Sequence, residues 1–381
     1  MPSLRRRLLV SLLSLSAGLS VAQSRAAAAD VAKGDGDRAR EQAVIKAIDY
    51  LRQKGQAEDG SFSRQAGPAV TALVTTGLLH SGLAVKDPMV AKALKYIEGF
   101  VHDDGGIYKE GSTHQNYETC VAILVLKEAN RDGQYDKVLK KAESFIKGLQ
   151  WDEQEGQDEA SLSYGGAGYG SKKRPDLSNT GFFIDALKAT GNGPDDEAMK
   201  KALLFVSRCQ NLETEHNTSP FAAKNPDGGF YYTVVGDGES FAGKLDNGGL
   251  RSYGSMTYAG LKSMIFAGVG PDDPRVKAAV EWAHKHYTLD SNPGMGEAGL
   301  YYYYHTFAKA LHALGETEFS DSDGTKHDWR RELAAELVNR QHADGSWSNS
   351  TPRWLESDPN LVTGYALLTL SYCRPNQAAD K

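Results

Sequence analysis

Side chains that could take part in chemistry gather just ahead of a set of apolar segments. They comprise two carboxylates, a serine, an amide, an arginine, an imidazole and several phenols: Tyr117, Glu118, Asp176, Ser178, Asn179, Arg251, Tyr253, Tyr303, Tyr304 and His305. Carboxylic acids and imidazoles can transfer protons, arginine pairs with anions, and aromatic rings suit an apolar ligand. These ten residues are the candidate cavity residues, and the sequence assigns a catalytic role to none of them.

Each candidate also has a purely structural interpretation. Asp176, Ser178 and Asn179 can simply cap a helix. The tyrosines from Tyr301 to Tyr304 can pack in a wall, and His305 can be a buried histidine with satisfied hydrogen bonds. Arg251 is the hardest to explain in this way, because an arginine that points into a cavity mouth needs an anionic partner.

The apolar segments that follow these residues repeat six times. A threonine is followed seven residues later by leucine or methionine in all but one of them, where Tyr304 replaces the threonine: Thr71–Leu78, Thr119–Leu126, Thr180–Leu187, Thr257–Met264, Tyr304–Leu311 and Thr363–Leu370. Several units then stop at a glycine, the usual residue after a helix C-terminus: Gly82, Gly191, Gly268 and Gly315. Because these helices are apolar around most of their circumference, we expect them to be buried.

A second class of helix alternates with the first and is apolar on one side only. Leu94, Ile97 and Val101 form such a stripe in one, and Val138, Ala142, Phe145 and Leu149 in another. Others begin near Ile45, Ala202, Val276 and Leu333. Six outer helices alternating with six buried ones predict an all-α fold, an (α/α)6 barrel.

This topology predicts where the candidate residues lie. An outer helix returns the chain between successive inner helices, so the inner helices run parallel and begin at the same end of the barrel. The ten candidate residues should therefore face that end, where the helix N-termini favour an anionic or carbonyl group. If they form one site, Arg251 should be the partner of its anion.

A glycine-rich turn that ends in a large apolar residue follows the outer helices. Clear copies are Asp59-Gly60-Ser61-Phe62, Asp104-Gly105-Gly106-Ile107, Asp227-Gly228-Gly229-Phe230 and Asp344-Gly345-Ser346-Trp347, with weaker copies at Tyr164-Gly165-Gly166 and from Gly294 to Tyr301. Asp-Gly favours turns with positive φ, and the terminal side chain can hold the turn against the barrel. We interpret these copies as structural.

The N-terminal segment has the features of an export signal. Arg5, Arg6 and Arg7 precede a leucine-, serine- and alanine-rich stretch over residues 8–21, and Ser20-Val21-Ala22 or Ala27-Ala28-Ala29 would suit cleavage. An uncleaved membrane anchor is the alternative, and the arginines weakly resemble a twin-arginine signal. The predicted organisation is a signal peptide and linker over 1–29, a toroid of six helix pairs over 30–376 and a tail over 377–381, in a protein exported to the periplasm or secreted.

The charge and the cysteine pattern argue against nucleic acid as a partner and against a metal or another cofactor. The formal net charge is −6 and there is no basic run beyond the N-terminal arginines, which argues against nucleic acid as a partner. The three cysteines, Cys120, Cys209 and Cys373, form no Cys-x-x-Cys motif and lie in or beside apolar helical segments. We expect buried thiols and neither a metal nor another cofactor.

On these repeats the chain resembles the prenyltransferase and squalene-cyclase repeat family, the terpenoid cyclases. The stretch from Glu336 to Trp347 is similar to that family's repeat, in which a helix ends in Gln and is followed by Gly-x-Trp, and Gln56 and Gln210 match it in part. The resemblance covers roughly residues 43–373. It implies a single α/α toroid with an apolar or terpenoid ligand in its cavity, and squalene cyclase-like, isomerase-type chemistry.

The family's catalytic motifs are degenerate in this chain. Protonating cyclases resemble one another in an Asp-x-Asp-Asp-Thr motif, and the matching run here is Asp176-Leu177-Ser178-Asn179-Thr180. The position of the acid is Ser178, whose hydroxyl cannot protonate an alkene, so we expect squalene not to be cyclised.

The zinc site of the protein prenyltransferases is also missing. Arg251 and Tyr253 stand where the resemblance would place the Asp and Cys ligands, and only His305 lies near the position of the family's histidine. We therefore expect no stoichiometric zinc and no α-subunit partner.

Three function classes stay open. The first is a cyclase-like or prenyl-transfer-related enzyme, the second an (α/α)6 polysaccharide lyase-like enzyme, and the third a non-catalytic lipid-binding or structural toroid. A closed aromatic cavity would favour the first or third. An open groove with His305, Tyr253 and Arg251 within mutual reach would favour the second.

Overall fold

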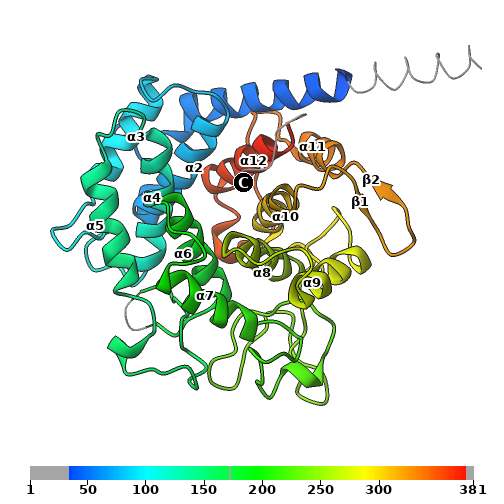
Figure 1. The fold of residues 1–381 in the computed structure, drawn as a ribbon. Coiled ribbons are helices and arrows are strands. Elements are labelled where there is room, and N and C mark those ends of the chain that lie inside the picture. Colours follow the sequence, from blue (N-terminus) through cyan, green and yellow to red (C-terminus); the bar gives the residue numbers. More distant parts are fainter. Residues whose placement is uncertain (1–33, 171–172, 375–381) are drawn as a thin grey trace, which may run out of the picture.

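The computed structural model describes residues 34–170 and 173–374, and within them six inner helices form a closed ring (Figure 1). Each inner helix packs against the next, and the last packs against the first. In chain order they are α2 (Pro68–His80), α4 (Gln115–Ala129), α6 (Leu177–Ala189), α8 (Gly254–Phe266), α10 (Leu300–Leu314) and α12 (Pro359–Tyr372). All six carry the repeated register found in the sequence.

Outer helices surround this ring. They are a helix over residues 34–50 that continues into the π-helical turn η1 (Leu51–Gly55), then α3 (Pro88–Glu98), α5 (Asp136–Lys147), α7 (Glu197–Arg208), α9 (Pro274–Lys285) and α11 (Trp329–Arg340). The described loops hold four short 3-10 helices, η2 (Arg64–Ala66), η3 (Glu153–Glu155), η4 (Ala222–Lys224) and η5 (Arg353–Leu355), and a hairpin of β1 (Phe319–Ser320) and β2 (Lys326–His327). The predicted all-α (α/α)6 fold is confirmed.

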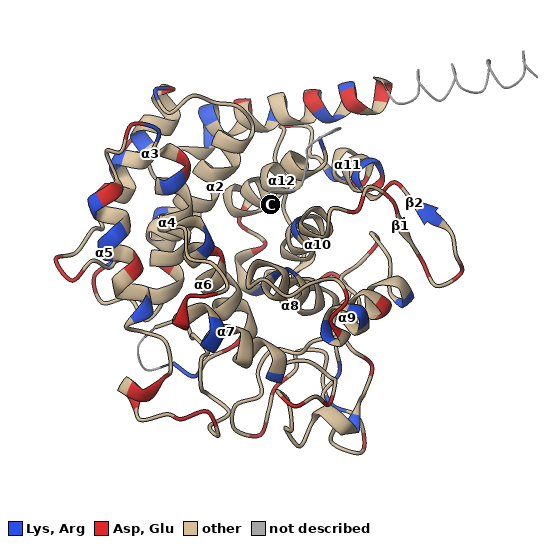
Figure 2. Cartoon of the chain, viewed as in Figure 1, with Lys and Arg blue, Asp and Glu red and all other residues tan. Residues whose placement is uncertain are grey.

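Burial separates the two helix classes as their sequences predict. Along α8 every residue from Gly254 to Met264 is buried, whereas α5 buries only Leu139, Ala142 and Ile146. Figure 2 shows the charged residues concentrated on the outer helices and loops. The hydrophobic effect therefore buries the inner helices on nearly all sides and leaves one face of each outer helix in contact with solvent.

The repeated threonine holds each glycine-rich turn against its inner helix. The backbone N–H of Phe62 donates to Thr71 Oγ1 at 3.0 Å, and Phe230 and Trp347 donate in the same way to Thr257 at 3.1 Å and Thr363 at 3.2 Å. In the fifth unit the hydroxyl of Tyr304 instead donates to the carbonyl of Leu289. The final side chains of the clear turn copies, Phe62, Ile107, Phe230 and Trp347, are fully buried.

A repeated glutamine links each of four turns to the next outer helix. Gln341 Nε2 donates to the carbonyl of Gly345, in its own turn, at 2.9 Å and to that of Ala43, in the N-terminal helix, at 2.8 Å. Gln56, Gln150 and Gln210 make the equivalent pairs of bonds. Since Gln341 joins the last unit to the first, it helps to close the ring.

Two further sequence expectations concern glycines and cysteines. The glycines that follow the inner helices, Gly82, Gly191, Gly268 and Gly315, all have positive φ, as glycines after a helix C-terminus usually do. All three cysteines are buried and free, as expected. The predicted export signal and the predicted C-terminal tail over 377–381 lie outside the described residues, and so the proposed domain boundaries stay predictions.

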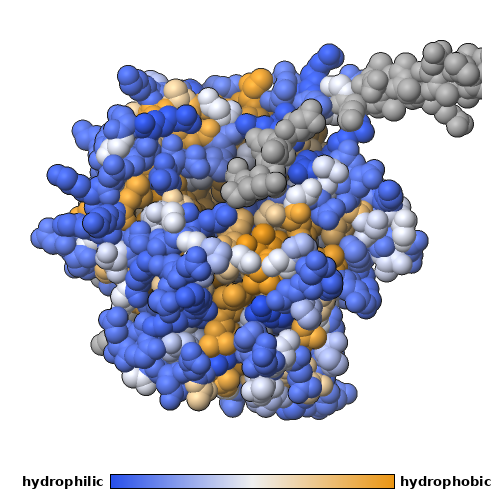
Figure 3. Space-filling view, in the orientation of Figure 1, coloured by the Kyte–Doolittle hydropathy of each residue, from blue (hydrophilic) through white to orange (hydrophobic). Residues whose placement is uncertain are grey.

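The face of the molecule that is turned toward the viewer in Figure 3 has an apolar centre. Figure 3 shows hydrophobic side chains gathered there and hydrophilic ones around them. No helix within residues 34–170 and 173–374 combines the length and apolar character needed to cross a bilayer.

Candidate ligand cavity

A cavity of about 640 Å³ opens where the inner helices begin. Its wall includes the first turns of α2, α4, α6, α8, α10 and α12, together with the loops that precede them. Nine aromatic residues of the described chain line it: Tyr117, Tyr169, Phe182, Tyr232, Phe241, Tyr253, Tyr302, Trp354 and Tyr365. Cavities of this size lined mostly by aromatic and apolar groups are typical of small-molecule sites.

The start of α6 supplies one polar part of the wall. Asp176 is the N-cap residue, and its Oδ1 accepts the backbone N–H of Asn179 at 2.9 Å. The side-chain amide of Asn179 donates to Asp176 Oδ2 at 2.8 Å. Burial raises the pKa of Asp176 to about 6, although the bonds from Asn179, Tyr232 and Ser178 favour the carboxylate. The carboxylate thus lies behind the wall, whereas Ser178, Asn179 and Tyr232 line it.

Hydroxyl groups pair with one another across the cavity. Ser178 Oγ and Tyr302 Oη are 2.9 Å apart, which joins α6 to α10. Tyr117 on α4 hydrogen bonds with Tyr365 on α12. Burial raises the pKa values of Tyr117, Tyr302 and Tyr365, so these phenols stay neutral. They can exchange hydrogen bonds with a neutral ligand.

Two buried carboxylates also line the cavity, and each is already held by donors. Glu118 accepts the backbone N–H of Lys109 at 2.7 Å and the hydroxyl of Ser112 at 2.6 Å. Glu356 accepts the backbone N–H of Tyr302 at 2.9 Å and the side-chain amide of Asn349 at 2.7 Å. Burial raises the pKa of both. Their hydrogen bonds hold them in the wall and stabilise their ionised forms.

The segment before α12 forms an apolar part of the cavity's edge. Trp354 and Leu355 line the cavity and both have positive φ, 55° and 65°. Trp354 packs against Phe241 at 5.3 Å between ring centroids, and the guanidinium of Arg353 lies over both rings. Bulky residues adopt this backbone conformation only when their surroundings hold it.

The structure brings five of the ten sequence candidates into the cavity wall. Tyr117, Glu118, Ser178, Asn179 and Tyr253 line it, and Asp176 lies directly behind Asn179. Capping and cavity formation are therefore linked at this helix start, because Asp176 caps α6 and holds the side chain of Asn179, which lines the wall.

Arg251 does not take the predicted place. It is exposed and outside the cavity wall, and its Nε donates to the backbone carbonyl of Lys244 at 3.4 Å. The structure corrects the expectation that Arg251 pairs with an anion in a shared site, because its loop directs it to solvent and to a neighbouring carbonyl.

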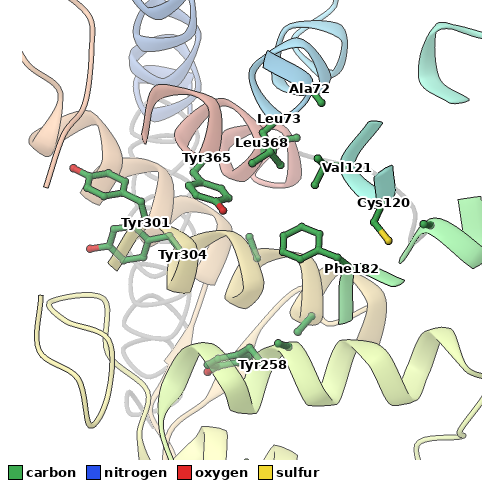
Figure 4. Close-up of a cluster of buried hydrophobic side chains, with 14 of the residues drawn as sticks. Ala72, Leu73, Cys120, Val121, Phe182, Tyr258, Tyr301, Tyr304, Tyr365 and Leu368 are labelled. Carbon is green, nitrogen blue, oxygen red and sulfur yellow. The ribbon is translucent and has the colours of Figure 1, made fainter. Parts of the chain in front are cut away.

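Tyr303 and Tyr304 are also outside the cavity wall. Their hydroxyls donate to the carbonyls of Thr288 and Leu289 in the loop that precedes α10. Figure 4 shows Tyr304 pointing away from the barrel centre, toward which Phe182 and Tyr365 point. Both tyrosines therefore pack the wall, which was the structural alternative.

His305 lies on α10 beside Tyr365 and Tyr372 and does not line the cavity. Burial and the neighbouring Lys309 lower its pKa to about 3, so the imidazole stays neutral. This places His305 in the packed interior of the barrel, and the structure corrects its assignment as a cavity residue.

The wall residues that the sequence candidates missed have three origins. Phe182, Tyr302 and Tyr365 lie on inner helices, and helical periodicity counted inward from the mouth could have found them. Tyr169 and Tyr232 each lie two residues after the end of a repeated glycine-rich turn, at Ala167 and Phe230, and this shared position could also have indicated them. Phe241, Trp354 and Leu355 come from inserted loops, for which the repeat gives no register.

A charged cluster lies in the barrel interior among α6, α8 and α10. Asp185 Oδ1 accepts from Lys262 Nζ at 2.8 Å, and Oδ2 accepts from Lys309 Nζ at 2.7 Å. Burial opposes ionisation of Asp185, but the two lysines lower its pKa. Burial lowers the pKa of Lys262 to about 8 despite Asp185. Within the described part of the chain, no group of three or more His, Cys, Asp or Glu side chains is placed to hold a metal.

Comparison with known proteins agrees with the fold. Residues 64–236 match the family model of the squalene-hopene cyclase C-terminal domain. No curated protein matches the chain in sequence at a significant level.

Solved structures match over nearly the whole fold. The type II terpene cyclase MstE from Scytonema matches at a TM-score of 0.54 and 13% identity, covering 88% of this chain and 97% of that one. A variant of MstE in complex with merosterolic acid A, its product, matches at a TM-score of 0.52 and 14% identity, covering 89% and 98%.

A protein from Actinoplanes matches at a TM-score of 0.51 and 16% identity, covering 88% of this chain and 99% of its own. Identities this low establish shared architecture and leave activity open. The family-model match over residues 64–236 and the matches to solved structures show that this chain shares the fold of the terpenoid cyclases.

Proposed function

We propose that this protein binds a terpenoid, or a chemically similar apolar small molecule, in the cavity at the start of the inner helices, and does not cyclise it by protonation. The observation that carries the proposal is the wall itself: aromatic rings enclose about 640 Å³, and its polar groups are mostly neutral hydroxyls and amides. MstE, which shares the fold, is described in complex with a terpenoid product, which supports this ligand class.

The side chains around the cavity argue against proton-initiated cyclisation. Protonating an alkene requires a carboxylic acid that faces the substrate in a dry pocket. Ser178 faces Tyr302, and Asp176 lies behind Asn179. Burial raises the pKa of Glu118 and Glu356, but the oxygens of both already accept hydrogen bonds from within the wall. The side chain of Glu110, at the cavity's edge, is 93% exposed to solvent. None of these acids is presented to a bound alkene in the way that this chemistry needs.

The polysaccharide lyase alternative lacks its expected arrangement. It required Arg251, Tyr253 and His305 within mutual reach in an open groove. Arg251 is exposed, Tyr253 lies in the wall of an aromatic cavity, and His305 is buried outside that wall. These positions agree better with a toroid that binds an apolar ligand in its cavity.

Native mass spectrometry of the purified protein tests the binding proposal, and we expect a co-purifying apolar molecule at about one per chain. Incubation with squalene, followed by gas chromatography and mass spectrometry, tests the second part. We expect unchanged squalene. Detection of hopene would overturn the non-cyclising part of the proposal, and failure to bind any terpenoid probe would overturn the whole of it.

We also propose that the protein acts after export. The support is the sequence: three arginines precede a short apolar stretch and two suitable cleavage positions. After expression with its own N-terminus, the intact mass of the exported fraction should lack residues 1–22 or 1–29. A full-length mass in a membrane fraction would instead indicate an anchor.

A further inference from the structure

An arginine without a counterion stands at the edge of the cavity. Arg353 begins η5, the short segment before α12, and its side chain is accessible to solvent. Within residues 34–170 and 173–374, its guanidinium lies over two aromatic rings and forms no ion pair with a carboxylate. A guanidinium stays charged at every physiological pH, so a fixed one beside an apolar cavity is suited to an anionic ligand group.

Two rings of the cavity wall hold the guanidinium in place. Its central carbon lies 4.5 Å from the ring centroid of Phe241 and 4.3 Å from that of Trp354. The two rings pack against each other, and both line the cavity. Stacking on ring faces leaves the N–H groups in the plane of the guanidinium free to donate. The cation is thus positioned at the mouth before any ligand arrives.

The positive charge of Arg353 also acts on the wall itself. Tyr253 lines the cavity, and burial raises the pKa of its hydroxyl well above the ordinary value. Arg353 opposes that rise, because a nearby cation favours the phenolate. The cavity wall on this side therefore lies within the field of the guanidinium.

The acid closest to Arg353 in the sequence does not neutralise it. Glu356 is 1% exposed, and its two oxygens accept the backbone N–H of Tyr302 at 2.9 Å and the side-chain amide of Asn349 at 2.7 Å. Both oxygens are thus occupied inside the wall. The guanidinium keeps its hydrogen-bond donors for a partner that comes from outside the chain.

Other charges near the mouth are balanced within the protein. Glu239, on the insertion that carries the stacked phenylalanine, forms an ion pair with Arg174. Lys109 is a second cation that lines the cavity, but it acts on the buried carboxylate of Glu118, whose pKa it lowers against the effect of burial. Arg353 is therefore the better placed of the two cations to receive an anion.

We propose that Arg353 binds a carboxylate at the mouth of the cavity, so that the ligand is an ionised terpenoid carboxylic acid in preference to a neutral terpenoid. The in-plane N–H groups donate to the two carboxylate oxygens, and the apolar body packs against Phe182, Tyr302 and the other rings. One cation balances one charge, which favours a carboxylate over a diphosphate. The inference rests on the proposed function and narrows it to a ligand class.

This assignment gives Arg353 a role in specificity and none in catalysis. It also moves to Arg353 the anion-binding role that the sequence predicted for Arg251. Both arginines are exposed, but only Arg353 contacts side chains of the cavity wall.

Matched ligands test the proposal on the intact wild-type protein. Isothermal titration calorimetry at about pH 7, where a carboxylic acid is ionised, measures the binding of geranylgeranoic acid, its methyl ester and geranylgeranyl diphosphate. The ester keeps the shape and both oxygens of the acid but has no charge. We expect the acid to bind about tenfold more tightly than the ester, as a charge-assisted hydrogen-bonded pair at a partly exposed position implies. This preference should shrink as salt is added, because ions screen an exposed pair.

Variants locate the preference. Arg353→Gln removes the charge and should bind the acid and the ester equally. Lys109→Gln removes the other cation of the wall and should keep the preference, and Arg251→Gln is the control for loss of an exposed arginine elsewhere. If Arg353→Gln does not fold by circular dichroism, Arg353→Lys takes its place. It keeps the charge but loses the planar pair of donors, so the preference should fall.

The outcomes separate the two proposals. Equal binding of acid and ester to the wild-type protein, or tightest binding of the diphosphate, overturns the carboxylate site and leaves the terpenoid cavity intact. A preference that survives Arg353→Gln, or that disappears in Lys109→Gln, overturns the assignment to Arg353. Failure of all three ligands to bind contradicts the proposed function itself.

Discussion

Asp176 shows how one side chain can serve the helix and the cavity together. Its carboxylate caps α6 and orients Asn179, and both tasks require the side chain to be buried. Burial raises the pKa of Asp176 to about 6, from an ordinary value of 3.8. The folded state therefore binds the proton more tightly than the unfolded state, which makes stability depend on pH.

For Asp176 we expect stability to fall as the pH rises. The raised pKa means that the favourable contribution of protonated Asp176 is fully present below pH 3.8 and is lost as the pH rises through about 6. The difference between a pKa of 3.8 in the unfolded state and about 6 in the folded state corresponds to about 3 kcal/mol of unfolding free energy. Urea unfolding of the wild type and of Asp176→Asn across pH 4 to 7 isolates this contribution. The wild type should lose stability relative to the variant over that range, and a constant difference would contradict the pKa.

At the scale of elements, the glycine-rich turns connect neighbouring helix pairs. Gly345 has φ of +92°, and a Cβ atom there would lie 2.3 Å from the backbone carbonyl oxygen of Lys46 in the N-terminal helix. Trp347 in the same turn is fully buried and donates its backbone N–H to Thr363. The turn of the last unit thus contacts the first helix directly.

Gly345→Ala should therefore be costly, and Gly324→Ala provides a matched control. Gly324, in the hairpin loop, also has positive φ, +80°, but a Cβ atom added there would meet no described atom within 4 Å. We expect Gly324→Ala to lower the free energy of unfolding by about 1 to 2 kcal/mol from backbone strain alone. Gly345→Ala adds the steric overlap and should cost about 3 to 4 kcal/mol. Equal losses in urea unfolding would show that the close approach to Lys46 is unimportant.

At the scale of the whole molecule, the ring encloses a charged cluster in its interior. Asp185, Lys262 and Lys309 come from three successive inner helices, and Lys262 also donates to the carbonyl of Gly181 at 2.9 Å. One carboxylate serves two lysines, so removing it leaves both cations without a counterion. Breaking a buried ion pair from one side is among the most damaging changes to a protein interior.

Asp185→Asn should lower the free energy of unfolding by about 3 to 5 kcal/mol. Lys262→Met is the informative comparison, since it leaves the Asp185–Lys309 pair balanced and should cost less than Asp185→Asn. Guanidinium unfolding followed by circular dichroism measures both. An Asp185→Asn variant within about 1 kcal/mol of the wild type would mean that the two lysines do not depend on this carboxylate.

The sequence by itself determined the architecture of this protein. The spacing of the threonines, the two helix classes and the glycine-rich turns are local patterns, and each reappears as a hydrogen bond or a buried side chain, as Thr71 with Phe62 and Thr363 with Trp347 show. The spacing of apolar residues indicates which face of each helix avoids water, and six helices with such faces can pack together in few ways. The same topology placed Tyr117, Ser178 and Asn179 at the end where the cavity lies.

Only the tertiary structure decided which of the candidates face the cavity. Arg251 and Tyr253 are two residues apart, yet one is exposed and the other lines the wall, because the direction of a loop residue depends on its non-local contacts. Phe241 and Trp354 reach the cavity from insertions of variable length that no repeat positions. The orientation of the Asn179 side chain depends on Asp176 holding its amide, a side-chain geometry that residue types and spacing do not specify.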